Sequence, residues 1–282
     1  MTAGRTLWAV SDLHVAARGN RELVDRYVRP TAPGDWLIVA GDVAERPGEV
    51  AAALEELRRR FATVIWVPGN HELFARADDP TRGRRRYDHL VDLCRGLGVL
   101  TPEDPYPSFA GHTVAPLFTL YDHSWRPAGS PPGATAAEAV AAAVDRGVMF
   151  TDEVAIAPYV DVPAWCADRV RTTVGRLAAV AGPSSPPTVL VNHWPLVRET
   201  TRRLAVPEVA LWSGTEHTQE WARRFRAAVV VHGHLHIPVE TVVDGVPHVE
   251  VSLGYPREQA RSLAPRIAAG LWPYPVLRET GR

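Results

Sequence analysis

The sequence contains no lysine and only two cysteines among its 282 residues. Arginine is therefore its only strongly basic residue. Together with abundant alanine, proline, valine and glycine, this is typical of codon bias in a high-GC bacterial genome. Cys94 and Cys166 are isolated and lack the regular spacing of a disulfide framework. This pattern argues against a small disulfide-rich protein, and we expect both cysteines to be buried thiols.

Long apolar runs and an excess of one charge are also missing. No stretch approaches the roughly 18 apolar residues of a membrane helix, and the run at residues 7–10 is too short for a signal-peptide core. These absences predict a cytoplasmic protein without membrane contact. A net charge of −1 and no extended basic face favour a small-molecule substrate over nucleic acid. The oligomeric state is left open.

With 46% hydrophobic and 22% charged residues, the composition is that of an ordinary globular protein. The pattern of apolar residues along the chain predicts an α/β fold. Short apolar or β-branched runs predict strands at residues 6–10, 36–40, 63–67, 113–120, 188–191, 227–231, 240–243 and 246–251. Helical spacing of apolar residues occurs at residues 21–28, 50–61 and 87–97. Strand–helix alternation up to residue 100 predicts parallel strands. Asp244-Gly245 between two apolar runs predicts a later antiparallel hairpin.

We therefore predict mixed sheets within one domain that takes in the whole chain. Its core covers about residues 6–254, and the proline-containing tail at 255–282 is expected to pack on the surface. Two segments have the character of insertions. One is the arginine-rich stretch at 76–86, and the other is the Ala/Gly/Ser/Pro-rich stretch at 128–134, which precedes an alanine-rich helix at 135–144.

Five short polar motifs lie at or near the ends of these apolar runs. They are Asp12-Leu13-His14, Gly41-Asp42, Gly69-Asn70-His71-Glu72, Asn192-His193 and Gly233-His234-Leu235-His236. Each has a structural alternative on its own, such as a helix cap, a tight turn or a structural histidine. However, the D-x-H and H-x-H spacings place two side chains on one face of an extended strand. Ligand sites in α/β folds also collect at the carboxyl ends of strands.

Together the motifs supply two aspartates, one asparagine and four histidines as candidate metal ligands. No cysteine is among them, which argues against a structural zinc site. Mixed oxygen and nitrogen ligands suit two ions a few ångströms apart, as two-metal phosphoester cleavage requires.

The order and spacing of the motifs resemble the calcineurin-like metallophosphoesterase family over roughly residues 7–254. The resemblance implies a four-layer α/β/β/α sandwich of two mixed β-sheets flanked by helices. It also implies a binuclear metal-dependent hydrolase that cleaves phosphomonoesters or phosphodiesters of a small molecule by direct attack of metal-bound hydroxide. Mn²⁺ is the expected ion, with Fe, Zn or Mg as alternatives.

The same resemblance assigns a place to each candidate ligand. One ion would be held by Asp12, His14 and His236. The second would be held by Asn70, His193 and His234, and Asp42 would bridge both. Catalytic roles fall to Asp42 and to His71, which would stabilise the phosphate or protonate the leaving oxygen. Purple acid phosphatases place a tyrosine at the position of Glu45, which argues against that subgroup.

Substrate selectivity is not contained in these motifs. The candidates for substrate contact are Tyr121, His123, Trp194 and Arg76. The alternative role for Trp194 is packing in the core, and the alternative for the stretch at 76–86 is a solvated loop without substrate contact. Two rival functions stay open, namely a nuclease-type phosphodiesterase and a non-catalytic metal-binding scaffold of the same fold.

Overall fold

The computed structural model describes residues 4–127, 130, 133–182 and 184–279. Residues 128, 129, 131 and 132 of the predicted insertion at 128–134, and residues 280–282 of the tail, lie outside the described residues. The strands are β1 (Thr6–Val10), β2 (Trp36–Val39), β3 (Thr63–Trp66), β4 (Ser108–Phe109), β5 (His112–Pro116), β6 (Thr188–Val191), β7 (Ala227–His232), β8 (Glu240–Val243), β9 (Val246–Glu250) and β10 (Tyr274–Arg278).

Helices connect most of these strands. The α-helices are α1 (Asn20–Tyr27), α2 (Pro47–Arg60), α3 (Asn70–Leu73), α4 (Arg84–Gly96), α5 (Ala136–Asp145), α6 (Asp152–Ala155), α7 (Val162–Val180), α8 (Trp221–Arg224) and α9 (Pro256–Ala268). Short 3-10 turns are η1 (Ala157–Tyr159), η2 (Arg198–Arg203), η3 (Pro207–Trp212) and η4 (Glu216–Thr218). None of the helices in the described part of the chain has the length and apolar character needed to cross a membrane.

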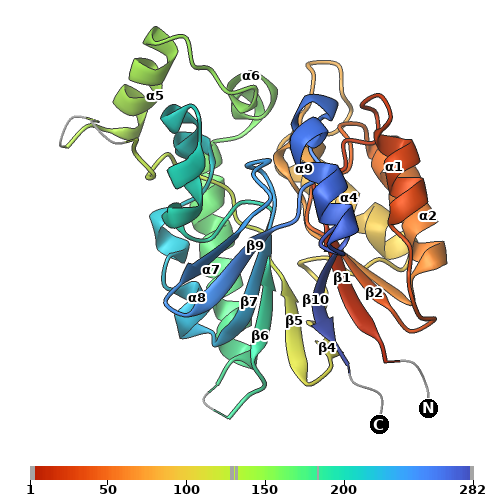
Figure 1. Cartoon of the computed structure of the whole chain (residues 1–282). Coiled ribbons are helices and arrows are strands. Elements are labelled where there is room, and N and C mark those ends of the chain that lie inside the picture. Colours follow the sequence, from red (N-terminus) through yellow and green to blue (C-terminus); the bar gives the residue numbers. More distant parts are fainter. Residues whose placement is uncertain (1–3, 128–129, 131–132, 183, 280–282) are drawn as a thin grey trace.

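The strands form two mixed sheets that face each other (Figure 1). The first has the order β10-β1-β2-β3, in which β1, β2 and β3 are parallel and β10 is antiparallel. The second has the order β4-β5-β6-β7-β9-β8, parallel from β5 to β9 and antiparallel at both edges. The predicted hairpin is present as β8 and β9, with positive φ at both Asp244 and Gly245.

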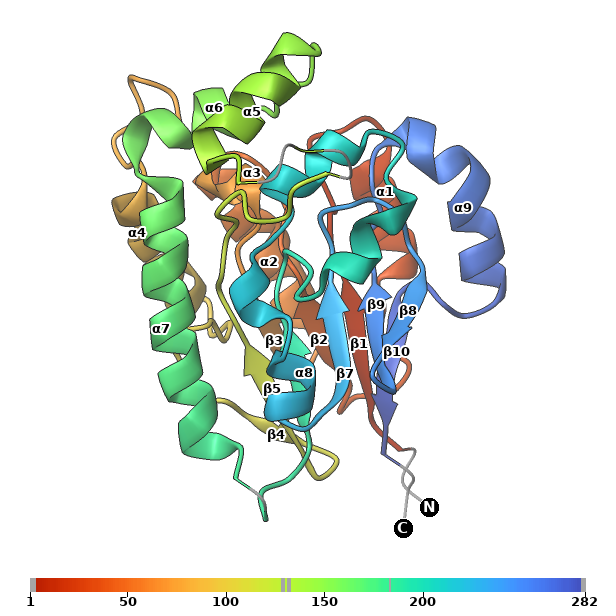
Figure 2. The same ribbon diagram turned by 90° about the vertical axis from the view of Figure 1, so that its left-hand side faces the viewer.

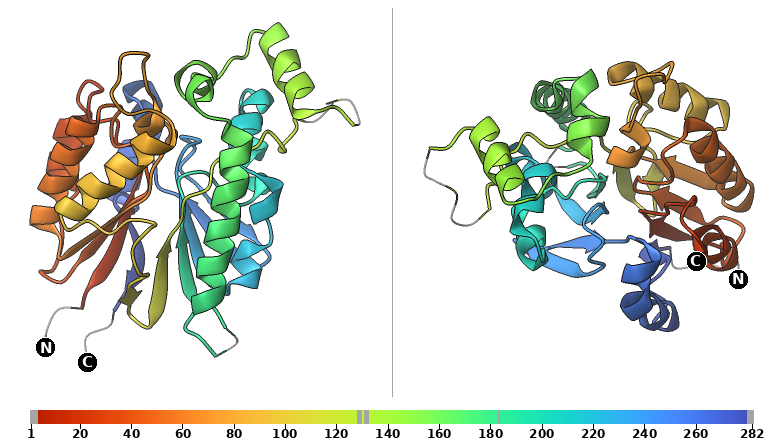
Figure 3. Two further views of the ribbon diagram at one scale, coloured as in Figure 1. Left: turned by 180° about the vertical axis from the view of Figure 1, so that it is seen from behind. Right: turned by 90° about the horizontal axis from the view of Figure 1, so that it is seen from above.

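Alternation of side chains along the strands creates a core on both faces of each sheet. Ile38 and Val191 represent the apolar layer between the sheets. The outer face of the first sheet is covered by α1, α2, α4 and α9, and that of the second by α7 and α8 (Figures 2 and 3). This confirms the four-layer α/β/β/α sandwich.

The segment at 76–86 is a loop only in part, because α4 begins at Arg84. Arg86 is buried and donates hydrogen bonds to the carbonyl oxygens of Glu72 and Glu45, which fastens the segment to the fold. Strand β5 ends at Pro116 rather than at residue 120. Pro116 has no N–H to continue the ladder, and the chain leaves the sheet soon after it.

The C-terminal tail does more than pack on the surface. Strand β10 pairs antiparallel with β1, and Leu263 of α9 and Trp272 join the core beneath the first sheet's helices. The backbone carbonyl of Arg5 also accepts a hydrogen bond from Glu279 N. As a result β1 is an interior strand, and α9 starts close to the carboxyl end of β1.

Candidate metal centre

The five polar motifs meet at one end of the sandwich, where the parallel strands β1, β2, β3, β6 and β7 finish. Each motif follows one of these strands, and hydrogen bonds link the loops after β1 and β2. The seven candidate ligands lie together there, and they are Asp12, His14, Asp42, Asn70, His193, His234 and His236. The structure thus brings together every side chain for which the resemblance implied a metal-binding role.

Three of these side chains form a first cluster. His236 Nε2 lies 3.0 Å from Asp12 Oδ1 and 3.3 Å from His14 Nε2. The Asp12 side chain is fully buried. One carboxylate oxygen and two imidazole nitrogens therefore converge on a single point.

A second cluster lies beside the first. Asn70 Oδ1 is 3.2 Å from both His193 Nε2 and His234 Nδ1, and those two nitrogens are 3.3 Å apart. Asp42 stands between the clusters, because its Oδ2 lies 3.5 Å from His193 Nε2 and 4.0 Å from His14 Nε2. A carboxylate in this position contacts the ligands of both clusters.

The protonation of two histidines shows what the clusters are suited to bind. His193 Nδ1 lies 2.8 Å from the carbonyl oxygen of Ala40, so this nitrogen carries the proton. His236 Nδ1 lies 2.7 Å from Glu258 Oε2, which assigns the proton in the same way. In both rings Nε2 then faces carboxylate or amide oxygens. Burial lowers the pKa of His236, but Asp12 and Glu258 outweigh it and raise that pKa well above its usual value, so in the metal-free protein Nε2 of His236 holds a proton that a metal ion would displace. A set of imidazole nitrogens, carboxylates and an amide oxygen at these distances fits divalent metal ions.

The backbone of the motifs allows neighbouring loops and side chains to approach one another closely. Asp12, His14, Asp42, His234 and His236 have φ between 40° and 75°, a region that side-chain-bearing residues seldom adopt. The glycines of the motifs leave room for the carboxylates. A Cβ on Gly69 would lie 2.1 Å from Asp42 Oδ1, and one on Gly233 would lie 2.2 Å from Asp12 Oδ2. Glycine is therefore required at both positions.

Glu72 ties two of the motif loops together. Its carboxylate accepts hydrogen bonds from the backbone N–H groups of Asp42, Val43 and Gly69. Burial raises the pKa of Glu72 to about 7, whereas these donors favour its ionised form. The residue that follows His71 thus holds the loops after β2 and β3 at a fixed separation.

His71 lies at the edge of the clusters. Its Nδ1 is 3.4 Å from Glu45 Oε1, and its Nε2 is 3.9 Å from Asp42 Oδ2. Burial lowers the pKa of His71, but the charge of Asp42 and the hydrogen bond to Glu45 outweigh it and raise the value to about 9. The imidazole is therefore protonated at neutral pH in the metal-free protein.

Several residues that no motif indicated also contact the clusters. The Tyr255 ring stacks on His14 with centroids 4.3 Å apart, and the Phe150 ring meets His234 edge-on at 5.7 Å. Asn70 Nδ2 donates a hydrogen bond of 3.0 Å to Asp152 Oδ1. Burial raises the pKa of Asp152 to about 7.

Three of the four predicted substrate contacts are buried, and the fourth is exposed. Tyr121 and Trp194 are fully buried, so neither has a surface with which to meet a substrate. The Trp194 ring instead packs against His193 and His234, at centroid distances of 5.1 Å and 5.8 Å. His123 is also buried, with Nδ1 3.2 Å from the carbonyl oxygen of Leu211. Arg76 is exposed.

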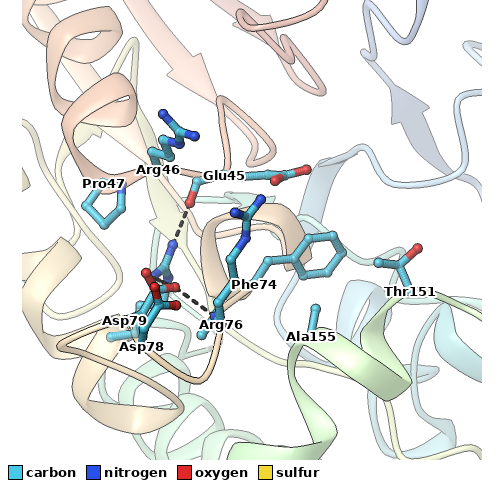
Figure 4. A pocket seen from close by; sticks show the side chains of 11 residues that line it. Glu45, Arg46, Pro47, Phe74, Arg76, Asp78, Asp79, Thr151 and Ala155 are labelled. Atoms are coloured by element: carbon cyan, nitrogen blue, oxygen red, sulfur yellow. Dashed lines mark hydrogen bonds and ion pairs between the residues drawn. The ribbon is translucent and has the colours of Figure 1, made fainter.

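One cavity reaches the centre, and a second lies beside it. One of about 410 Å³ is lined by His14, His71 and Tyr255, and it also touches Arg76. A second of about 440 Å³ shares Arg76 with the first. In Figure 4 this second cavity lies between Glu45, Arg46 and Pro47, at the start of α2, and Thr151 and Ala155 of the α6 region.

Comparison with known proteins identifies the family. The sequence model of the calcineurin-like phosphoesterase family matches residues 5–238, which is most of the chain. The chain belongs to the calcineurin-like phosphoesterase family. It is accordingly a metal-dependent phosphoesterase, a hydrolase rather than a non-catalytic scaffold, and its clustered ligands are suited to divalent ions.

Two further comparisons found a similar sequence and a similar crystal structure. The [acyl-carrier-protein] phosphodiesterase PptH of Mycobacterium tuberculosis is 49% identical over 264 residues, which cover 91% of this chain and 80% of the relative. The crystal structure of phosphopantetheinyl hydrolase (PptH) from Mycobacterium tuberculosis is similar with a TM-score of 0.87 and 48% identity. That likeness covers 93% of this chain and 94% of the other.

Proposed function

We propose that this phosphoesterase hydrolyses the phosphodiester that joins phosphopantetheine to a carrier protein. The observation that carries the proposal is the 49% identity to an acyl-carrier-protein phosphodiesterase over 91% of the chain. The sequence predicted the phosphoester of a small molecule as the substrate. In the present proposal the substrate is a small phosphoester group that is attached to a protein. Water would add to phosphorus, and the bond from phosphorus to the carrier-protein oxygen would break.

The metal centre is proposed to contain two ions. Asp12, His14 and His236 would hold one, Asn70, His193 and His234 would hold the other, and Asp42, which lies between the two clusters, would serve both. Bound divalent ions would activate water and neutralise the charge of the phosphate. We propose Mn²⁺, which the oxygen ligands suit, with Fe or Zn, which the imidazoles suit, or Mg as alternatives. A cytoplasmic location is part of the same proposal.

His71 is the proposed proton donor. It borders the cavity beside His14, and Glu45 orients its ring through Nδ1. The protonated Nε2 is then free to donate a hydrogen bond to a phosphate oxygen or a proton to the leaving oxygen. Asp42 lies close enough to favour the protonated ring.

Arg76 is the proposed contact for the rest of the substrate. Arg76 is exposed and lines both cavities, so an anionic group bound in either one would lie near its guanidinium. Tyr121, His123 and Trp194 have no such access and are left out of the proposed substrate site.

The test uses a carrier protein loaded with phosphopantetheine. We expect the wild-type enzyme with Mn²⁺ to convert it to the unmodified carrier, as measured by intact-protein mass spectrometry. Asp42→Asn should remove this activity, because Asp42 contacts both ligand clusters. Cleavage of a generic aryl phosphate without any change in the carrier would refute the substrate proposal alone. Wild-type rates in Asp42→Asn would refute the site assignment.

A further inference from the structure

Helix α9 reaches the metal centre although it lies beyond residues 5–238, the part that matches the family model. Glu258 is the third residue of this helix. Its Oε2 accepts a hydrogen bond of 2.8 Å from the backbone N–H of Tyr255 and lies 2.7 Å from His236 Nδ1. One carboxylate oxygen thus caps the helix and contacts a proposed metal ligand.

The geometry fixes the state of the His236 ring. Because Glu258 is an ionised carboxylate, its Oε2 can only accept, so it accepts from both the Tyr255 N–H and the ring, and His236 Nδ1 carries a proton. The other ring nitrogen, Nε2, then faces Asp12 Oδ1 and His14 Nε2, at 3.0 Å and 3.3 Å. Rotation of the ring would break the contact with Glu258.

The turn before α9 is itself held against the first cluster. Gly254 N donates to the carbonyl oxygen of Asp12 at 3.1 Å, and Leu253 N donates to that of Ser11 at 2.9 Å. Gly254 has φ +74°, and a Cβ there would lie 2.8 Å from Glu258 Oε2. Strand β10, which follows α9, is paired with β1. The position of Glu258 is therefore fixed from both sides.

We propose that Glu258 is a positioning residue of the metal centre. It sets the tautomer and orientation of His236 and so raises the affinity for the ion held by Asp12, His14 and His236. Partners of this kind typically change metal affinity 10- to 100-fold. The inference rests on the proposed role of His236 as a ligand, and it does not depend on the identity of the substrate.

Glu258→Gln tests the inference with a matched control. Glutamine keeps the size of the side chain and an acceptor for Tyr255 N–H, but removes the charge next to His236. The control is Glu138→Gln, because Glu138 has the same third position and caps α5 through Thr135 N, on an exposed part of that helix. Mn²⁺ titration of the metal-free proteins by calorimetry should show one of two binding events weakened about 10-fold or more in Glu258→Gln. Both events should be unchanged in Glu138→Gln.

Further variants separate positioning from folding. Glu258→Asp restores the charge with a shorter reach and should recover part of the affinity. Circular dichroism of the metal-free proteins should show that both variants fold, and the Tm of Glu258→Gln should lie below that of Glu138→Gln because it also loses the charge beside His236. Wild-type affinity for both ions in Glu258→Gln overturns the proposal, and so does an affinity loss no larger than that of Glu138→Gln. His236→Ala should lose one binding event, and two intact events there would instead overturn the ligand assignment.

Discussion

Unusual backbone conformations are concentrated in the residues that form the metal centre. Five of the seven proposed ligands have positive φ, which costs about 1–3 kcal/mol for each residue that bears a side chain. Hydrogen bonds between the loops maintain this geometry, as Asp12 N donates to the carbonyl oxygen of Gly41 and His14 N to that of Asp42. The loops are thus held with their side chains close together.

His71→Ala separates catalysis from metal binding. The ring contacts Asp42 but lies at the edge of the clusters, so we expect two ions to remain bound while turnover falls by about 10²- to 10⁴-fold. Metal content by elemental analysis and phosphodiester hydrolysis would be measured on the same preparation. His89→Ala, at an exposed position of α4, is the control and should behave as wild type. Loss of an ion from His71→Ala would contradict the assigned role.

The sequence identified the proposed ligands but not the residues that hold them. The D-x-H, G-N-H and H-x-H spacings are local, so they are visible in a single sequence. Glu258 and Asp152 contact ligands that lie 22 and 82 residues away, through folding alone. Pro256 and Glu258 are typical of a helix's first turn, and that pattern does not show that the carboxylate also meets a histidine.

Among the elements, the buried parallel strands were predicted, whereas the edge strands β4 and β10 were not. Runs such as Val189-Leu190-Val191 are apolar on both faces, because helices cover one face of the sheet and the second sheet covers the other. Strand β10 is only half-buried and contains Pro275, so its sequence lacks that pattern. It becomes a strand because β1 offers an unpaired edge, which is a property of the tertiary structure.

Gly175→Ala should stabilise α7 without affecting the site. Gly175 lies on an exposed face of that helix, and a Cβ there would meet no atom within 4 Å. The substitution lowers the entropy of the unfolded chain, so we expect the free energy of unfolding to rise by about 0.5–1 kcal/mol. Urea denaturation of the metal-free protein measures it. Gly69→Ala is the contrasting variant and should destabilise the protein, because its Cβ would meet Asp42 Oδ1 at 2.1 Å. Equal stability of the two variants would contradict this reasoning.

In the whole molecule, the metal centre joins the two sheets. Asp12, His14, Asp42 and Asn70 follow strands of the first sheet. His193, His234 and His236 follow strands of the second. The apolar layer between the sheets ends at these residues. Bound ions would therefore cross-link the two halves of the sandwich at the end where that layer stops.

Removal of metal should lower the stability of the whole protein. Ions that bind only the folded chain stabilise it by mass action, by about 2.7 kcal/mol for a single site at 100 times its Kd. Without ions, His193 Nε2 and His234 Nδ1 face each other at 3.3 Å with no cation between them. We expect chelation to lower Tm and the addition of Mn²⁺ to restore it, as followed by thermal denaturation. Asp42→Asn should respond less to Mn²⁺, since it lacks the charged bridge between the clusters. An identical Tm for the chelated and the Mn²⁺-loaded wild type would show that the ions do not link the sheets.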